Sequence, residues 1–251
     1  MALYTTTEGI VLKTQNIGEA DRVCTIYSPT KGKTRAVARG ARRSGSRFVS
    51  STQMFAYGDF QIFTGKSLDG ISQVQLKEAF PRLHDDLTRL AYASYVAELV
   101  EEMTEEGDGD RVLFDMLLAY MRVLSETLEP QLVTVAFEIK FATILGYRPR
   151  LESCAECGRK DLGREVFFSP EAGGLACSEC YLRDSGGMRI SRGAVELLKT
   201  LLMMEFRKVE RVKANPGTRL EIERLIRSHL GFRVNRRLRS LDFLEAVTRT
   251  P

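Results

Sequence analysis

The 251-residue chain lacks several features that mark common classes of protein. No uninterrupted apolar run approaches the ~18 residues that a membrane-spanning helix needs. The N-terminal MALYTTTEGIVLK has no basic segment followed by a long apolar stretch, so we expect no signal peptide. Of all residues, 43% are hydrophobic and 28% are charged, as in ordinary globular proteins. We therefore expect a cytoplasmic protein with one or two main domains.

The sequence also offers little to catalysis. It contains only two histidines, His84 and His229, and their context favours helix-surface or capping positions. GKT at 32–34 and GKS at 65–67 resemble the end of a phosphate-binding loop. That motif needs a glycine five residues earlier, where Tyr27 and Phe60 stand. The acidic run at 101–110 lacks the EF-hand pattern and favours a solvated helix end. We expect a protein that is not an enzyme.

The five cysteines are unevenly distributed along the chain. Cys154-x2-Cys157 and Cys177-x2-Cys180 are separated by 19 residues, the two-knuckle spacing of tetrahedral zinc sites. With four thiolates there is no open position for water, so one zinc ion per chain should be structural. Redox-active cysteines and packed free thiols are the alternatives. Cys24 lies alone in a strand pattern and is predicted to be a small buried hydrophobe.

Hydrophobic periodicity predicts an α+β fold. Five short strands with glycine-marked turns occupy residues 1–80 and favour a five-stranded OB-fold barrel. From Pro81 the period becomes helical, with one long helix first, and we divide the rest into a helical part at 81–150, the cysteine module at 151–187 and a second helical part at 188–251. Ser191 is predicted to cap one helix of the last part, and Thr218 with Glu221 is predicted to form a capping box at another.

Residues 31–47 form a basic stretch. They contain seven lysines or arginines, and no acidic residue stands between Asp21 and Asp59. Alternation along the third predicted strand puts Lys33, Arg35 and Arg39 on one face and small residues on the other. Such a surface could attract a phosphate backbone, an acidic protein or an anionic membrane. The stretch lacks the bulky apolar face of a membrane-surface helix, which disfavours the membrane.

Five segments of the chain resemble the RecO family of bacterial recombination mediators. They are EGIVLKTQNIGEADRVCTIYSPTKGKTRAVARGARR, YGDFQIFTGKSLDGISQ, RLAYASYVAEL, LGYRPRLESCAECG and RSHLGFRVNRRLRSLDFL. The resemblance covers nearly the whole chain in order. It implies a protein that binds single- and double-stranded DNA, anneals complementary strands and acts with RecR to load RecA onto DNA coated by single-strand binding protein, whose acidic tail it binds. It also implies a nucleoid-associated location.

The resemblance suggests a role for the basic stretch. The hypothesis is that its cations contact phosphates, with the arginines around Ser44-Gly45-Ser46 in a flexible loop, and that Tyr57 stacks on a base. A zinc-stabilised adaptor for acidic protein tails is the alternative, and a zinc-containing nuclease or hydrolase is a more distant one. The candidate DNA contacts are Lys31, Lys33, Arg35, Arg39, Arg42, Arg43 and Arg47.

Overall fold

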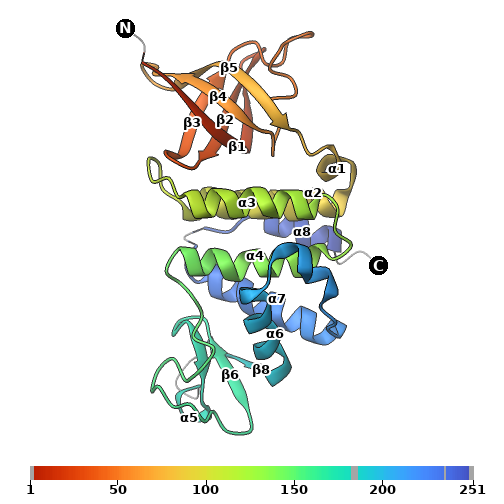
Figure 1. The fold of residues 1–251 in the computed structure, drawn as a ribbon. Coiled ribbons are helices and arrows are strands. Elements are labelled where there is room, and N and C mark those ends of the chain that lie inside the picture. The colour runs from red at the N-terminus through yellow and green to blue at the C-terminus, as the bar shows by residue number, and fades with distance from the viewer. Residues whose placement is uncertain (1–2, 182–185, 235, 249–251) are drawn as a thin grey trace. The chain divides into compact units, whose positions relative to one another are not determined.

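A computed structural model describes residues 3–181, 186–234 and 236–248 and divides the chain into two compact units (Figure 1). The first unit is formed by residues 1–126 together with 238–251, and the second by residues 127–237. Within the described ranges, no helix has both the length and the apolar character needed to cross a membrane.

The first unit opens with a closed five-stranded barrel. Its strands are β1 (Tyr4–Ile17), β2 (Asp21–Ser28), β3 (Gly32–Ala38), β4 (Tyr57–Phe63) and β5 (Asp69–Glu78), paired in the order β1-β2-β3-β5-β4. The long β1 pairs with both β2 and β4, and a register shift between Val11 and Lys13 lets it curve from one to the other. Only β3 and β5 pair in parallel. The structure confirms the predicted OB-fold barrel.

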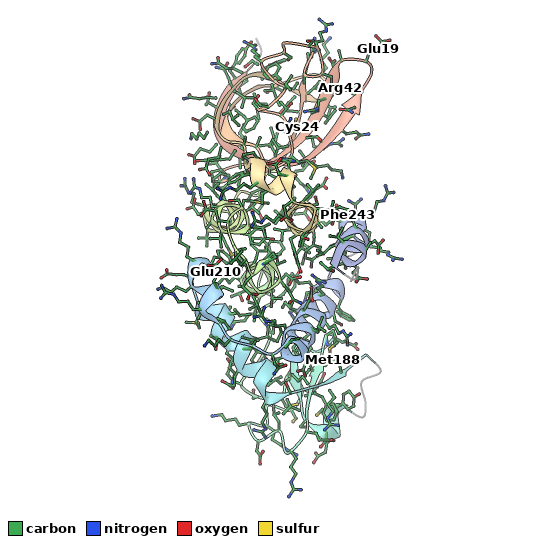
Figure 2. The ribbon with its side chains drawn as sticks, turned by 90° about the vertical axis from the view of Figure 1, so that its right-hand side faces the viewer. Glu19, Cys24, Arg42, Met188, Glu210 and Phe243 are labelled. Atoms are coloured by element: carbon green, nitrogen blue, oxygen red, sulfur yellow. The ribbon has the colours of Figure 1, made fainter. Side chains whose placement is uncertain are left out.

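The barrel core is built by alternation along its strands. Ala36 and Ala38 of β3 are fully buried, whereas Arg35, which precedes Ala36, is exposed, as the predicted inward and outward faces require. Phe60 and Ile62 of β4 enter the same core. Cys24 is also fully buried there, as predicted, and burial raises the pKa of its thiol to about 12. Figure 2 labels Cys24 inside the barrel and Arg42 at its edge.

Residues 39–56 connect β3 to β4 through a series of turns packed on the barrel. Phe48 is buried and belongs to the barrel core. Thr52 is fully buried, and its main-chain oxygen and hydroxyl both accept hydrogen bonds from Nη1 of Arg22, at 3.1 and 3.2 Å. The segment predicted as a flexible loop is therefore anchored on the barrel by Phe48 and Thr52, while the turn around Gly45 is exposed and a side chain added at Gly45 would have open space around it.

Four helices complete the first unit: α1 (Pro81–Asp85), α2 (Leu87–Met103), α3 (Arg111–Leu124) and α8 (Arg239–Thr248). The single long helix predicted from Pro81 is wrong. Asp86 adopts an extended conformation that ends α1, and its carboxylate accepts a hydrogen bond from the Arg89 N–H at 2.9 Å to begin α2. Figure 1 shows α2 and α3 side by side below the barrel. Because α2 is buried nearly all round, it forms the centre of this unit.

The second unit is a helical cluster with a small sheet. The helices are α4 (Pro130–Ile144), α6 (Arg192–Met203) and α7 (Pro216–Gly231), with a 3-10 turn, η1 (Phe206–Arg211). The strands β6 (Val166–Ser169), β7 (Gly174–Ala176) and β8 (Met188–Ile190) pair in the order β7-β6-β8, and α5 (Ser178–Tyr181) follows β7. The central helix α4 packs against α6, η1 and α7.

The two predicted helix caps in this unit have different outcomes. Ser191 caps α6 as predicted, and its hydroxyl accepts a hydrogen bond from the Ala194 N–H at 3.1 Å. The predicted capping box at Thr218 is wrong. Helix α7 begins earlier, with Asn215 as its cap and its side-chain oxygen 2.8 Å from the Thr218 N–H.

Candidate metal centre and basic surface

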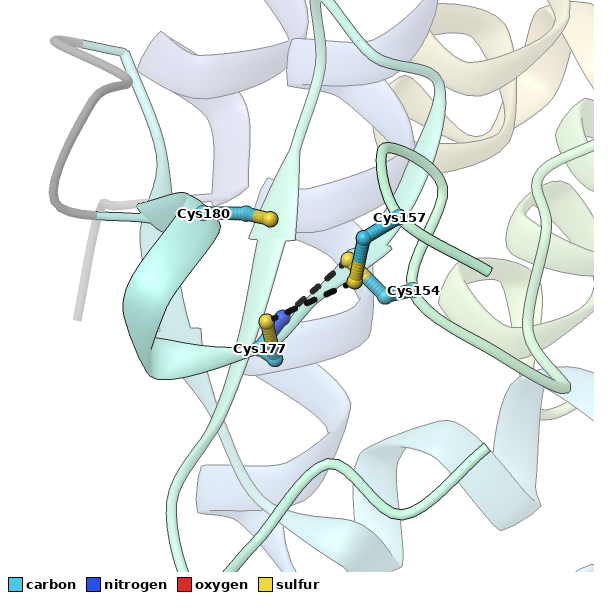
Figure 3. Close-up of side chains that lie close together, drawn as sticks. All are labelled: Cys154, Cys157, Cys177 and Cys180. Atoms are coloured by element: carbon cyan, nitrogen blue, oxygen red, sulfur yellow. Dashed lines mark hydrogen bonds between the residues drawn. The ribbon is translucent and has the colours of Figure 1, made fainter. Parts of the chain in front are cut away.

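The four paired cysteines converge on one point in the second unit (Figure 3). Cys154 and Cys157 lie in the loop before β6, Cys177 follows β7, and Cys180 lies in α5. All four Sγ atoms lie within 4.8 Å of one another, and those of Cys157 and Cys177 are 3.9 Å apart. Tetrahedral zinc–thiolate geometry, with bonds of about 2.3 Å, separates its sulfurs by about 3.8 Å. A disulfide needs about 2.05 Å, and all four cysteines are free.

Local backbone geometry holds the cluster together. The Gly158 N–H donates to the Cys154 carbonyl at 3.0 Å, with Gly158 in the left-handed region at φ 74°. The Ala155 N–H donates to the Leu175 carbonyl at 2.7 Å and so ties the first knuckle to β7. Arg159 and Glu179 form a bidentate ion pair between the two knuckles, at 2.9 and 3.1 Å.

The electrostatics of the cluster fit a bound cation. Burial opposes ionisation of the Cys154 thiol, but hydrogen bonds from the main chain of Cys157, Cys177 and Glu156 outweigh it and lower its pKa to about 6. A hydrogen bond with Cys177 and the closeness of the other thiols raise the pKa of Cys180 to about 12. The Cys154 thiol thus ionises readily while the Cys180 thiol resists ionisation. A metal ion would remove that mutual repulsion, so the donor set suits a metal.

The predicted DNA-contact residues divide into two groups in the first unit. Arg35, Arg39 and Arg43 are exposed, and their guanidinium groups form no hydrogen bond or ion pair with any residue that the structure describes. Arg42 and Arg47 are also exposed, but each donates to one main-chain oxygen, that of Gly18 at 3.3 Å and that of Ser72 at 2.7 Å. Because those acceptors are neutral, all five arginines keep an uncompensated positive charge.

The two lysines are held more closely. The ammonium of Lys33 donates to the main-chain oxygens of Glu101, at 2.5 Å, and Thr104, at 2.8 Å, near the end of α2. Lys33 therefore fixes the barrel to this helix end, where carbonyls lack helical partners and attract a cation. Lys31 donates to the Thr5 hydroxyl at 3.2 Å. The alternation rule placed Lys33 on the outer face correctly but could not show that α2 covers this end of the strand.

Tyr57 needs a correction. Its side chain is only 8% exposed, and its hydroxyl bonds the Glu8 carboxylate at 3.2 Å. Its ring lies 6.1 Å from that of Phe114 on α3, with Lys77 and Arg122 also close to it. A base could not stack on a ring covered in this way. Tyr57 packs the barrel against α3, and helix packing of this kind leaves no signature in a strand pattern.

The fold and the cysteine cluster together define a class of protein. It has an OB-fold barrel, helical regions, and a module in which four cysteines are placed to hold a metal ion. The family model described as "Recombination protein O N terminal" matches residues 1–80, and that described as "Recombination protein O C terminal" matches residues 84–242. The chain belongs to the RecO family, as the resemblance predicted.

Curated relatives agree over the full length. DNA repair protein RecO of Symbiobacterium thermophilum is 37% identical over 250 residues, which cover 98% of each chain. The protein of the same name from Pelotomaculum thermopropionicum is 36% identical, over 100% of this chain and 97% of its own. That of Moorella thermoacetica is 35% identical, over 96% of this chain and 90% of its own.

Proposed function

We propose that this protein is a DNA-binding recombination mediator of DNA repair. It would bind single- and double-stranded DNA through phosphates, anneal complementary strands, and help RecR load RecA onto DNA coated by single-strand binding protein. The observation that carries the DNA-binding proposal is the row of exposed arginines without acidic partners on β3 and the 39–56 connector, above all Arg35, Arg39 and Arg43. Phosphate contact is independent of sequence, as annealing of any complementary pair requires.

The proposed mechanism is charge neutralisation on an ordered surface. Phe48 and Thr52 are buried in or against the barrel and Arg42 and Arg47 each donate to a main-chain oxygen, so the connector holds these two side chains in place. Less conformational entropy is then lost when a phosphate binds. Two strands whose charges are screened in this way can approach and pair. The step needs no acid, base or nucleophile, so we propose that the protein is not an enzyme.

The partners are proposed on family membership alone. They are RecR, the acidic tail of single-strand binding protein and, indirectly, RecA. With DNA as its substrate, the protein would act in the cytoplasm at the nucleoid. The competing adaptor function predicts tight binding to acidic proteins beside weak DNA binding with little salt dependence.

Salt-dependent binding of single-stranded DNA tests this function. Arg35→Ala plus Arg39→Ala should lower the slope of log affinity against log salt by about one to two units. Arg82→Ala plus Arg207→Ala is the matched control, because it removes the same charge from exposed positions outside the barrel face. If the two double variants had equal slopes, Arg35 and Arg39 would not contact the DNA, and the DNA-binding surface would have to lie elsewhere.

We further propose that the metal held by Cys154, Cys157, Cys177 and Cys180 is a structural zinc ion. Four thiolates fill its coordination shell, so it would stabilise the module without activating water. Elemental analysis of reduced protein should find about one zinc per chain, and Cys154→Ser should lose the metal and unfold the module. Cys24→Ala, which removes the thiol of the barrel, should keep it. Folded, reduced protein without metal would contradict the proposal.

A further inference from the structure

A pocket of about 420 Å³ lies in the second unit, where β6 and β8 meet the start of α6. Figure 1 shows β8 beside β6 and leading into α6. Three arginines line this pocket, Arg164, Arg189 and Arg192. Its size falls within the roughly 300–1,000 Å³ of pockets that bind small ligands. No sequence motif marks it, because its residues come from three separate segments.

The two acidic residues of the pocket differ, because one pairs with an arginine and the other bonds neutral groups. The Glu165 carboxylate pairs with Arg189 at 3.0 Å. The Glu221 carboxylate accepts hydrogen bonds from the N–H and the hydroxyl of Ser191, the latter at 2.6 Å.

Two of the three arginines keep their charge uncompensated. Arg192 donates to the Gly163 carbonyl at 2.6 Å, which is a neutral partner. Arg164 is exposed and forms no ion pair or hydrogen bond within the described ranges. With three arginines against two glutamates, Glu165 and Glu221, the pocket keeps one net positive charge.

The positions of these two arginines are unfavourable for the fold itself. Strands β6 and β8 are antiparallel with Val166 opposite Ile190, so Arg164, two residues before β6, and Arg192, two residues after β8, lie at the same end of the strand pair. Both side chains line the same pocket, and like charges that line one pocket repel each other. Arg192 is also the first residue of α6, where the helix dipole disfavours a cation. Side chains that break local rules in this way commonly belong to a functional site, and a bound anion would relieve both conflicts.

We propose that this pocket binds phosphodiester groups of a single nucleic-acid strand, with Arg164 and Arg192 as its principal contacts. Guanidinium groups match phosphate oxygens in geometry and charge. The inference rests on the proposed function and deepens it. Annealing requires two strands to be held at once, and this pocket supplies a phosphate site on the second unit, separate from the arginines of the barrel.

The test compares two double variants of the full-length protein with equal loss of charge. The pocket variant is Arg164→Ala plus Arg192→Ala. The control is Arg207→Ala plus Lys213→Ala, two exposed cations of the same unit that lie outside the pocket. Binding of a labelled oligothymidylate is measured across about 50–200 mM salt, and annealing of two complementary oligonucleotides is timed. The pocket variant should lose about one to two units of salt slope relative to the control and should anneal more slowly.

The single variant Arg164→Glu tests the pocket with little risk to the fold, because this exposed side chain forms no ion pair within the described ranges. It should also weaken DNA binding. If the pocket variant matches the control while Arg35→Ala plus Arg39→Ala weakens binding, the inference fails and the proposed function stands. If the unaltered protein shows no salt-dependent binding, both fail. Binding of a polyglutamate peptide that depends on Arg164 and Arg192, with DNA binding unchanged, would assign the pocket to an acidic protein instead.

Discussion

At the scale of single residues, His229 on α7 is completely buried among polar partners. Its Nε2 lies 2.7 Å from the Tyr147 carbonyl and its Nδ1 lies 3.2 Å from a guanidinium nitrogen of Arg233. Nε2 therefore donates and Nδ1 accepts, which requires the neutral ring. The helix-surface position expected from the sequence is wrong for this histidine, because the residues that bury it are distant in the chain.

Burial, aided by the charge of Arg233 and opposed by the bond to Tyr147, lowers the pKa of His229 from 6.5 to about 4. The unfolded chain then binds more protons than the folded chain between these two values, so stability is lost as the pH falls below 6.5. We expect the free energy of unfolding to decrease by about 2 kcal/mol through this group between pH 7 and pH 5. Urea denaturation of the wild type and of His229→Gln at both pH values measures the difference.

The other histidine provides the control for this prediction. His84 is partly exposed, and its Nε2–H donates to the Met54 carbonyl at 3.2 Å. His84→Gln should therefore keep the pH dependence that His229→Gln removes. A wild type equally stable at pH 7 and pH 5, or a His229→Gln variant with the wild-type dependence, would contradict the assignment of the neutral ring.

At the scale of elements, the start of α7 shows how a cap is chosen. Asn215 followed by Pro216 is a favourable beginning, because the asparagine side chain accepts an orphan N–H and proline is suited to the first helical position. Glu221, which the capping-box pattern assigned to Thr218, instead bonds Ser191 at the start of α6. The carboxylate thus joins two helices, a role that a pattern confined to four residues cannot reveal.

The two candidate caps can be compared directly. Asn215→Ala should cost about 1 kcal/mol of stability, since the Thr218 N–H loses its partner. Thr218→Ala should change stability by less than about 0.5 kcal/mol, because its side chain is not the cap. Thermal unfolding of both variants decides between the two, and a larger loss for Thr218→Ala would restore the capping box.

At the scale of the whole molecule, the chain returns to its first unit at the C-terminal end. Helix α8 packs against α2 and buries Leu244 completely. The Glu98 carboxylate on α2 accepts hydrogen bonds from the N–H of Ser240 at 2.7 Å and from its hydroxyl at 2.5 Å, at the start of α8. The first unit therefore includes α8, although most of the unit precedes residue 127.

Neighbouring residues of α8 allow a test of this closure. Leu244→Ala should destabilise the protein by about 2–4 kcal/mol, because it leaves a cavity against α2. Phe243→Ala should cost less than about 1 kcal/mol, since Phe243, labelled in Figure 2, is 38% exposed. Chemical denaturation followed by circular dichroism gives both values. Equal effects would mean that α8 does not contribute its Leu244 face to the core.

The sequence by itself determined the features that depend on neighbouring residues. Alternation located the five strands of the barrel and the inward face of the third, and the spacing of Cys154, Cys157, Cys177 and Cys180 indicated that their sulfurs converge. Both are short-range patterns, because the backbone geometry of a strand or of a two-residue knuckle is fixed within a few residues.

Only the tertiary structure decided which of the predicted side chains stay exposed and which are occupied by contacts within the protein. Lys33 is bound by main-chain oxygens near the end of α2, and Tyr57 is covered by α3. Arg164 and Arg192 share one pocket although they lie in separate segments. Each outcome depends on residues that meet only after folding. Burial and charge compensation are properties of that packed environment, so local pattern predicted the scaffold, whereas long-range packing determines which cations stay exposed without an acidic partner.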